Sequence, residues 1–350
     1  MNIKDKFVDA LTSAAADWRE DDHSLREAAI QDTLDAPNRW TEQALDHALN
    51  RWMQRLTQEG VTRWLDGATL EGRPTVAVVH GNDSPFSGIR SAIAVWALGG
   101  HYIGVLPEGA PALLPAFAEA VQAYDLDVPI EFAGRDEALG RADAVLAAPG
   151  EEEARDTLAE ACEAAGVPAE RRHLQRVCYS IGLVDGHESE DEMGRLAEDM
   201  LLYEGKGRRR LGILWAPADH PPDNYLEAMA GFRGHFPTHE DTPGALQMQQ
   251  AFLEAQDQPH AYAEGMEFLL SRGEPVLQKP GHVRWTEYEA LDDLDVWWRE
   301  HRDEVYAIVA RPHLHDQCPD EWPLRTPGGI YIPPLDDAEG TSVVDFLCAL

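Results

Sequence analysis

Basic side chains gather in one short stretch, YEGKGRRRLGILWAP at residues 203–217, of a chain that is otherwise strongly acidic. Guanidinium and ammonium groups bind phosphates and carboxylates through charge-assisted hydrogen bonds, and the planar fork of arginine suits both anions. The stretch therefore predicts a candidate anion-binding cluster. Its members are Lys206, Arg208, Arg209 and Arg210.

A structural interpretation of the same cluster is equally open. In an acidic chain, cations form ion pairs with nearby carboxylates, and Glu198, Asp199 and Glu204 are close in the sequence. Exposed pairs of this kind stabilise a protein little and need no function. The sequence therefore leaves both anion binding and surface ion pairing open as roles for the cluster.

Thiols are the next chemically active groups, and the chain has four of them: Cys162, Cys178, Cys318 and Cys348. No two are spaced as CxxC, so the sequence indicates neither a disulfide framework nor a four-cysteine zinc site. We expect reduced thiols. Cys178 lies in or beside a predicted strand, where a cysteine is more commonly a small core residue than a nucleophile.

Two imidazoles and a thiolate stand close together in RPHLHDQC, at His313, His315 and Cys318. Their spacing matches no closed zinc module, and the sequence names no fourth ligand. A polar loop with a half-buried cysteine explains the same residues. We therefore expect no metal site.

Short apolar runs alternate with helical patterns between residues 74 and 184, which predicts the elements that must position these side chains. Strands alternating with helices of this length indicate a parallel sheet with crossover helices on both faces, the architecture of dinucleotide-binding domains. The strand-like runs are at 75–79, 102–106, 130–133, 143–148 and 180–184, and the helical ones are at 91–100, 113–124 and about 151–165.

The residue composition and the spacing of apolar residues change on either side of this region. Residues before it carry apolar side chains at helical spacing, and Thr41 is placed to cap the helix that contains Trp52. Residues after it are richer in Pro, His, Gln and Trp, with apolar runs at 211–215, 266–270 and 305–309. The predicted division is an N-terminal helical segment at 1–72, a dinucleotide-binding-like domain at 73–184, a second α/β domain at 185–310, and a C-terminal return and apolar tail at 311–350.

The charge balance limits the partners of the chain. Its 350 residues include 29 Lys and Arg against 63 Asp and Glu, a formal net charge of −34. Such a surface repels nucleic acid and anionic membranes, and it destabilises the folded state unless salt screens it. We therefore expect no nucleic-acid partner and interpret the acidity as halophilic adaptation to a saline cytoplasm. No stretch predicts a signal peptide or membrane span, so we expect a cytoplasmic protein.

Six landmarks in collinear order resemble the LuxC-type acyl-CoA reductases, a branch of the aldehyde dehydrogenase superfamily. They cover most of the chain and read NRWTEQALDHAL, VAVVHGNDSP, DAVLAAPG, YEGKGRRRLG, MEFLL and PPLDDAEGTSVVDFLCAL. The resemblance implies an α/β fold of the aldehyde dehydrogenase type: a Rossmann-like cofactor domain, a second catalytic-type domain and an oligomer-forming element. It also implies NADPH as cofactor and a fatty aldehyde as product.

The implied reaction needs a cysteine that takes the acyl group from CoA before hydride reduces the enzyme-bound thioester. In the family pattern this nucleophile follows the second glycine of a GLG turn, which reads Gly205, Lys206, Gly207 in this chain, and the next residue is Arg208. A guanidinium group is no nucleophile at any accessible pH. The resemblance therefore implies a family member without its thiol.

The implied cofactor positions also depart from the family pattern. Leu106 stands about where members carry a nucleotide-binding Lys, Gly81 lies in the turn after the first strand, and the Gly-Ser turn beneath the pyrophosphate reads Pro149, Gly150. Glu151, Glu152 and Glu153 follow, and carboxylates at a helix start satisfy the dipole and repel phosphate, although they are also simply a well-charged helix start. We expect a degenerate nucleotide site.

Asn82 in HGN is the feature of the implied site that persists. Superfamily members use such an amide to hold a thioester oxygen as it becomes an oxyanion. Asn82 could equally shape a strand-to-helix turn with Gly81. Relative to the family pattern, this chain has one more residue between Asn82 and Pro85. Both roles stay open for this side chain.

Two functions follow. The first is a silent reductase homologue, a pseudoenzyme that keeps the scaffold to bind an acyl-CoA, an acyl carrier, another anion or a partner subunit. The alternative is a working NADPH-dependent long-chain acyl-CoA reductase. Losses at the nucleophile, the cofactor Lys and the Gly-Ser turn favour the first. Family analogy adds a homo-oligomer or an association with an acyl-transferring enzyme.

Overall fold

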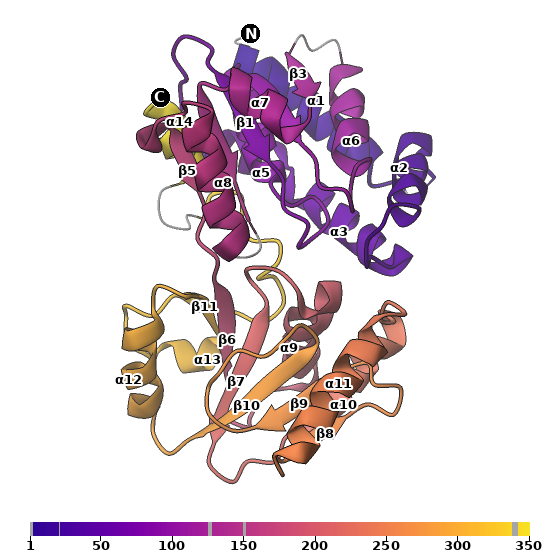
Figure 1. Ribbon diagram of the computed structural model, residues 1–350, viewed down its shortest axis with the longest axis vertical. Coiled ribbons are helices and arrows are strands. Elements are labelled where there is room, and N and C mark those ends of the chain that lie inside the picture. The colour runs from indigo at the N-terminus through magenta and orange to yellow at the C-terminus, as the bar shows by residue number, and fades with distance from the viewer. Residues whose placement is uncertain (1–2, 21, 125–127, 150–151, 338–341) are drawn as a thin grey trace. The chain divides into compact units, whose positions relative to one another are not determined.

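The protein is described by a computed structural model that covers residues 3–20, 22–124, 128–149, 152–337 and 342–350. The chain forms two compact units (Figure 1). The first comprises Met1–Val177 and Ile332–Leu350, and the second comprises Cys178–Tyr331.

The first unit is built on a five-stranded parallel sheet with the order β3-β2-β1-β4-β5. The sequence steps outward from β1 to β2 and β3, then returns to the other side of β1, so the strand order reverses between β1 and β4. In open α/β sheets, ligands bind at the carboxyl ends of the strands at such a switch point. The strands are β1 Thr75–Val79, β2 His101–Val105, β3 Ile130–Phe132, β4 Ala144–Ala147 and β5 Arg172–Leu174.

Helices of the first unit pack around this sheet because their apolar faces match its buried strands. One core cluster joins Ala77, Ile103 and Val145 of three neighbouring strands to Leu158 and Cys162 of α8. Full burial of a large aliphatic side chain stabilises a fold by about 1.5–3 kcal/mol. The helices are α1 Ile3–Asp17, α2 Ser24–Leu34, α3 Glu42–Arg55, α4 Gln58–Trp64, α5 Ile89–Leu98, α6 Leu113–Gln122, α7 Arg135–Arg141, α8 Glu152–Ala164, the short 3-10 helix η1 Ala169–Arg171 and α14 Val343–Cys348.

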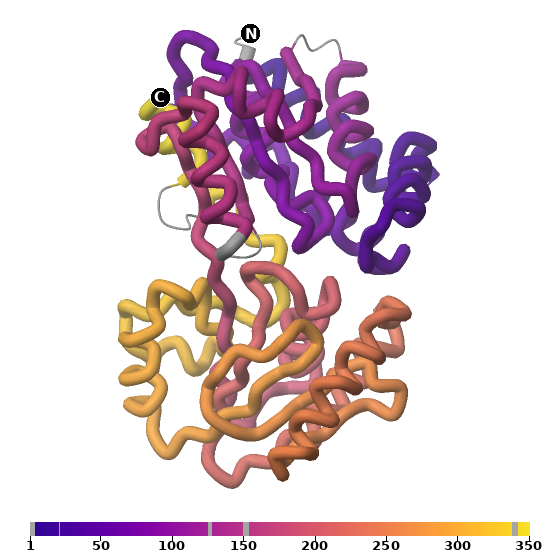
Figure 2. Tube along the Cα trace, in the orientation of Figure 1, coloured from indigo at the N-terminus to yellow at the C-terminus, as the bar shows by residue number. Residues whose placement is uncertain are grey.

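One sequence prediction about this unit is confirmed in detail. Thr41 caps α3, because its side chain accepts a hydrogen bond from the Ala44 N–H at 3.3 Å. The apolar C-terminal tail packs inside the chain: α14 lies against α5, and the Phe346 ring lies 5.3 Å from the His173 ring. In Figure 2 this segment is the yellow end of the tube beside α8.

The second unit holds a seven-stranded sheet with the order β12-β11-β6-β7-β10-β9-β8, parallel except for β8. Its strands are β6 Tyr179–Leu183, β7 Leu211–Pro217, β8 His260–Tyr262, β9 Leu269–Arg272, β10 His282–Tyr288, β11 Val305–Ala310 and β12 Leu324–Arg325. Its helices are α9 Glu190–Leu201, the 3-10 turn η2 Leu202–Gly205, α10 Asp223–His235, α11 Thr242–Ala255, α12 Leu291–His301 and α13 Pro312–His315.

The strand at 180–184 differs from the sequence prediction, which placed it in the first sheet. It is β6 of the second sheet, paired with β7 and β11. A fully buried apolar strand suits the interior of either parallel sheet, so its composition carries no information about which sheet it joins.

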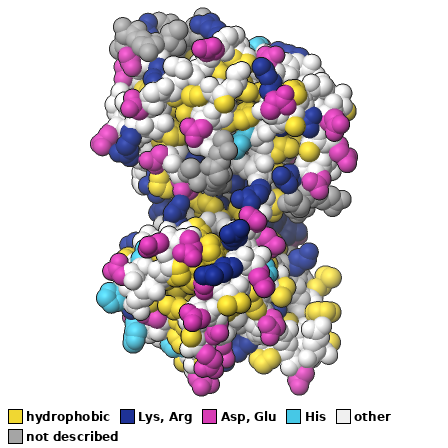
Figure 3. Space-filling model, turned by 90° about the vertical axis from the view of Figure 1, so that its left-hand side faces the viewer, with side chains coloured by type: hydrophobic (Ala, Val, Ile, Leu, Met, Phe, Trp, Pro, Cys, Tyr) yellow, Lys and Arg dark blue, Asp and Glu magenta, His cyan; other side chains and the backbone are white. Residues whose placement is uncertain are grey.

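Acidic side chains are spread over the surface, as Figure 3 shows for one face. None of the helices in the described residues is long and apolar enough to cross a bilayer.

Candidate functional site

The four basic residues lie together in the turn that connects η2 to β7. The backbone here is left-handed at Tyr203, Glu204 and Gly205, with φ of 52°, 61° and 61°, and again at Gly207 with φ of 98°. Side chains other than glycine adopt this conformation at a cost, so tertiary contacts must hold it.

Contacts of the buried Glu204 and Tyr203 side chains hold the turn in this conformation. The Glu204 carboxylate is 5% exposed, accepts a hydrogen bond from the Thr242 hydroxyl and lies 3.4 Å from Nη1 of the buried Arg233. The Tyr203 ring meets the Tyr331 ring edge-on at 5.1 Å. The Tyr331 hydroxyl donates to the Lys206 carbonyl at 2.9 Å, so both sides of the turn are fixed.

The arginines of the cluster have separate environments. Arg210 is a brace of the turn, because it donates to the Gly205 carbonyl at 3.2 Å and the Gln278 carbonyl at 2.9 Å. The Arg209 guanidinium lies 5.2 Å from the centre of the Tyr306 ring, within cation–π distance. Arg208 is buried, with 7% of its surface exposed.

The backbone of the cluster is tied to the neighbouring strand. The Ser180 N–H donates to the Arg210 carbonyl at 2.7 Å, and the Ser180 hydroxyl donates to the Arg209 carbonyl at 2.8 Å. Since β6 and β7 are parallel, the cluster lies at the amino end of β7 and the first residues of β6 lie beside it.

Two of the carboxylates considered as ion-pair partners have other roles. Glu204 is engaged with Arg233 and Thr242, as described above. Asp199 is 1% exposed and accepts hydrogen bonds from the N–H groups of Gly328 at 2.7 Å, Gly329 at 3.1 Å and Ile330 at 3.4 Å. Glu204 and Asp199 therefore bind other groups and are not ion-pair partners of the basic cluster.

Burial raises the pKa of Asp199 to about 7, although the three N–H groups favour its charged form. Asp199 thus connects α9 to the loop that carries Tyr331, the residue whose hydroxyl holds Lys206. The Asp199 carboxyl therefore supports the basic turn indirectly: it binds the loop at Gly328 to Ile330, and Tyr331 of that loop binds Lys206.

Asn82 lies in the first unit, in the loop after β1, and its side chain is exposed. Its amide packs closely over Gly109: a methyl group at Gly109 would lie 2.5 Å from Asn82 Oδ1 and 3.1 Å from Cβ of Asn38. Asn38 belongs to the NRWTEQ landmark of the sequence. The structure thus brings two of the landmark asparagines together, which their separation in sequence did not reveal.

His80 supports the loop that carries Asn82. Its Nδ1 lies 2.7 Å from the Ser87 carbonyl and its Nε2 lies 2.7 Å from the Tyr102 hydroxyl. Because a carbonyl only accepts, Nδ1 carries the proton and Nε2 accepts from Tyr102. Burial lowers the pKa of His80 to about 4, so the ring is neutral at physiological pH.

Two of the predicted cofactor positions, Gly81 and Leu106, follow the carboxyl ends of the neighbouring strands β1 and β2. Gly81 and Leu106 line one cavity of only about 10 Å³, which has room for one water molecule. A methyl group at Gly81 would lie 2.7 Å from the Ala148 carbonyl, so the loops after β1 and β4 touch. Leu106 offers a phosphate no hydrogen-bond donor. Gly150 and Glu151 lie outside the described residues, as do the side chains of Glu152 and Glu153.

Two of the cysteines and the histidine loop have structural surroundings. Cys162 is buried in the core of the first unit, where burial raises the pKa of its thiol, and the half-buried Cys318 packs against the core of the second. His315 Nε2 lies 3.0 Å from the Ala310 carbonyl, so it is a donor there. Among the described residues, no three His, Cys, Asp or Glu side chains are grouped to hold a metal ion.

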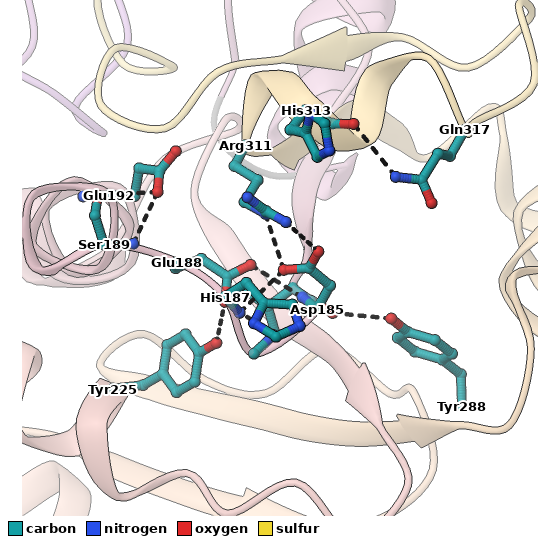
Figure 4. Close-up of polar contacts among 12 residues, drawn as sticks. Asp185, His187, Glu188, Ser189, Glu192, Tyr225, Tyr288, Arg311, His313 and Gln317 are labelled. Carbon is teal, nitrogen blue, oxygen red and sulfur yellow. Dashed lines mark hydrogen bonds and ion pairs between the residues drawn. The ribbon is translucent and has the colours of Figure 1, made fainter.

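Sequence reasoning missed a polar network at the carboxyl ends of the second sheet (Figure 4). Arg311, directly after β11, donates from Nε and Nη2 to the Asp185 carboxylate at 2.9 and 2.6 Å. Glu188 accepts from the N–H groups of Asp185 and Gly186 at 3.0 and 3.1 Å and from the Tyr225 hydroxyl. The sequence did contain an indication of this network, because Asp185 and Arg311 each directly follow an apolar, strand-like run.

This network lies at the opposite edge of the sheet from the basic turn. The turn precedes the amino end of β7, a strand of seven residues, and the network follows the carboxyl ends of β6 and β11. At about 3.3 Å per residue the two edges are roughly 20 Å apart. Donors and acceptors of the network satisfy one another, so it braces the turn before α9.

The overall fold matches solved aldehyde dehydrogenase structures. A candidate methylmalonate-semialdehyde dehydrogenase from Sinorhizobium meliloti, solved with NAD, superposes with a TM-score of 0.71 at 10% identity and covers 99% of this chain and 84% of its own. An NAD-dependent benzaldehyde dehydrogenase from Corynebacterium glutamicum gives 0.65 at 10% identity, covering 91% and 78%. Betaine aldehyde dehydrogenase from Staphylococcus aureus gives 0.66 at 11% identity, covering 92% and 74%.

The chain thus has the aldehyde dehydrogenase fold, with a parallel Rossmann-like sheet, a second mixed sheet and N-terminal helices, which confirms the predicted fold class. No protein-family model matches the sequence. No curated protein matches it either. At identities of 10–11% the likeness defines the fold and leaves the chemistry to the residues of this chain.

Proposed function

We propose that this protein is a catalytically silent relative of the LuxC-type acyl-CoA reductases, which uses the aldehyde dehydrogenase scaffold to bind an anionic ligand. The ligand class is an acyl-CoA or acyl carrier, recognised through its phosphate or carboxylate. The observation that carries the proposal is Arg208, a buried guanidinium in the glycine turn where the resemblance places the thiol. A permanently charged group cannot attack a thioester, but it suits a bound anion.

The cofactor side supports loss of catalysis. Hydride transfer would require NADPH, and the resemblance assigns its site to Gly81, Leu106 and Gly150. Leu106 in place of a Lys removes a hydrogen-bond donor to phosphate and argues against a bound nucleotide. A working NADPH-dependent reductase is the alternative, and retention of Asn82 is the observation in its favour.

Two further properties belong to the same proposal. Family analogy suggests a homo-oligomer or a complex with an acyl-transferring enzyme. The net charge of −34 suggests a saline cytoplasm as the working environment.

Calorimetric titration with CoA, a long-chain acyl-CoA and NADPH in high KCl tests the proposal. We expect CoA or acyl-CoA to bind and Arg208→Gln to weaken that binding about ten- to hundredfold, since one charge-assisted hydrogen-bond pair is lost. Arg299→Gln, which removes a side chain that is 63% exposed on α12, is the control and should bind as the wild type does. Equal affinities of the wild type and Arg208→Gln would contradict the proposal, as would failure of every anion to bind.

A further inference from the structure

A groove of about 660 Å³ runs between α9 and α10 of the second unit. These two helices pack side by side after β6 and β7. The volume falls within the range of small-molecule sites, roughly 300–1,000 Å³. It is far larger than the cavity at the predicted cofactor positions.

Two glycines keep the groove open. Gly194 on α9 and Gly231 on α10 both line it, and a methyl group built on either would meet no atom within 4 Å. Both residues are in regular helix, where glycine costs about 1 kcal/mol relative to alanine. Neither residue has a positive φ, so the backbone does not require glycine there, and only a side chain larger than alanine would enter the groove.

Aromatic rings form part of the groove wall. Phe232 and Phe236 line it and stack with their centroids 4.7 Å apart and their planes 12° from parallel. Met193 and Ala228 add to the apolar lining, and all four side chains are only partly buried. Such a wall suits a flat or aliphatic group. The Arg233 guanidinium already lies 5.9 Å from the centre of the Phe232 ring.

Three carboxylates and the His235 ring are the ionisable groups of the groove lining. Glu188, Glu190 and Glu227 contribute carboxylates, and no Lys or Arg is among the lining residues. Glu188 is held in place by two backbone N–H groups and by the hydroxyl of the buried Tyr225 (Figure 4). A carboxylate fixed in this way attracts a cation without first losing side-chain freedom.

We propose that this groove binds a small organic cation: a primary or quaternary amine attached to an aromatic or aliphatic group. The apolar part would lie on the Phe232 and Phe236 rings, and the ammonium group would lie among the three carboxylates. The same carboxylates repel the phosphates of an acyl-CoA. The groove is therefore a second site, independent of the anion site at Arg208.

Three matched probes test the site by titration followed by NMR or calorimetry. Phenethylammonium carries both the ring and the cation. 3-Phenylpropanoate has the ring with an anion, and ethylammonium has the cation without the ring. We expect phenethylammonium to bind at least about tenfold more tightly than either of the others. Equal binding of the two ammonium probes would mean general attraction to an acidic protein and would overturn the proposal.

Variants locate the binding on the protein. Glu227→Gln should weaken phenethylammonium binding about three- to tenfold, and Gly231→Leu should abolish it by filling the groove while the helix is retained. Glu160→Gln, an exposed residue of α8 in the first unit, is the matched control for loss of one negative charge and should change nothing. Unaltered binding by folded Gly231→Leu, checked by its thermal transition, would contradict the site.

Discussion

Arg208 is the residue on which the proposed function depends. Arg208 is one of the buried arginines of the described residues, and it lies in a turn whose backbone is left-handed at four of its residues. Burial of a guanidinium group carries a desolvation cost that a protein offsets with partners or a ligand. Its place in the fold, and not its charge alone, makes it a candidate for anion binding.

Asp199 should make the stability of the second unit fall as pH rises. Its pKa of about 7 in the folded protein lies above the ordinary value of 3.8, so folding takes up a proton between these values. The stabilisation is complete below about pH 4 and is lost as pH rises through 7. Relative to Asp199→Asn, the wild type should lose about 2–3 kcal/mol of unfolding free energy between pH 5 and 8.

Urea unfolding at several pH values and constant high KCl measures this difference. Asp199→Asn keeps an acceptor for the N–H groups of Gly328 and Gly329 but has no titration. Parallel pH profiles of the two proteins would rule out a titrating Asp199 in this range.

The Asp185–Arg311 pair should have the opposite dependence on pH. Burial alone would raise the pKa of Asp185, but the hydrogen bonds from Arg311 and from the His187 N–H outweigh it and lower the pKa. Stability from this pair is therefore present above the ordinary pKa of 3.8 and lost as pH falls through the folded value.

Removing the charge of Asp185 leaves Arg311 without its carboxylate. We expect Asp185→Asn to lower the free energy of unfolding by about 1–3 kcal/mol at pH 7, measured by urea unfolding. Asp316→Asn, at an exposed position nearby in the sequence, should cost less than about 0.5 kcal/mol. Equal effects of the two substitutions would show that the bidentate pair contributes nothing.

At the scale of elements, the turn between η2 and β7 is the part under most constraint. Gly205 has φ of 61°, and a methyl group there would lie 2.8 Å from the Met200 carbonyl and 2.9 Å from the Gly281 nitrogen. We expect Gly205→Ala to destabilise the protein by about 2 kcal/mol or more, because neither backbone atom can move freely.

Gly194→Ala is the matched comparison for that substitution. It lies in α9 with no atom within 4 Å of the added methyl group, and it should stabilise the protein by about 0.5–1 kcal/mol. Thermal or urea unfolding ranks the two variants. A Gly205→Ala protein as stable as Gly194→Ala would mean that the left-handed turn is not held as described.

Elements of the first sheet were predictable because their patterns are strong. The runs at β1, β2 and β4 are apolar and buried on both faces, and the helices between them have clear periodicity. Short polar strands were missed: β5 reads RHL and β8 reads HAY, and they belong to sheets only because a neighbouring strand pairs with them. Long-range pairing is not encoded in local pattern.

The site was partly predictable for the same reason. Lys206 and Arg208 to Arg210 are adjacent in sequence, so their clustering required no fold. The contacts of Glu204 with Arg233 and Thr242, and of Asp199 with Gly328, span 29 to 129 residues and followed only from the tertiary structure. The groove between α9 and α10 likewise depends on how two helices pack.

For the molecule as a whole, acidity sets the conditions under which it is stable. With a formal net charge of −34, folding brings many carboxylates together, and salt weakens their repulsion. We expect the thermal midpoint to rise by about 5 °C or more from dilute buffer to molar KCl. Tetramethylammonium chloride at equal ionic strength distinguishes screening from specific potassium binding. A midpoint independent of salt would contradict the halophilic interpretation.

The most direct test of catalytic silence follows NADPH absorbance with a long-chain acyl-CoA in high salt, for the wild type and Arg208→Cys. We predict no NADPH oxidation by the wild type, because Arg208 cannot form an acyl-enzyme and Leu106 offers a nucleotide phosphate no hydrogen-bond donor. Turnover by Arg208→Cys alone would identify the nucleophile as the main loss. Turnover by the wild type, with aldehyde formed in equal amount, would contradict the proposed function.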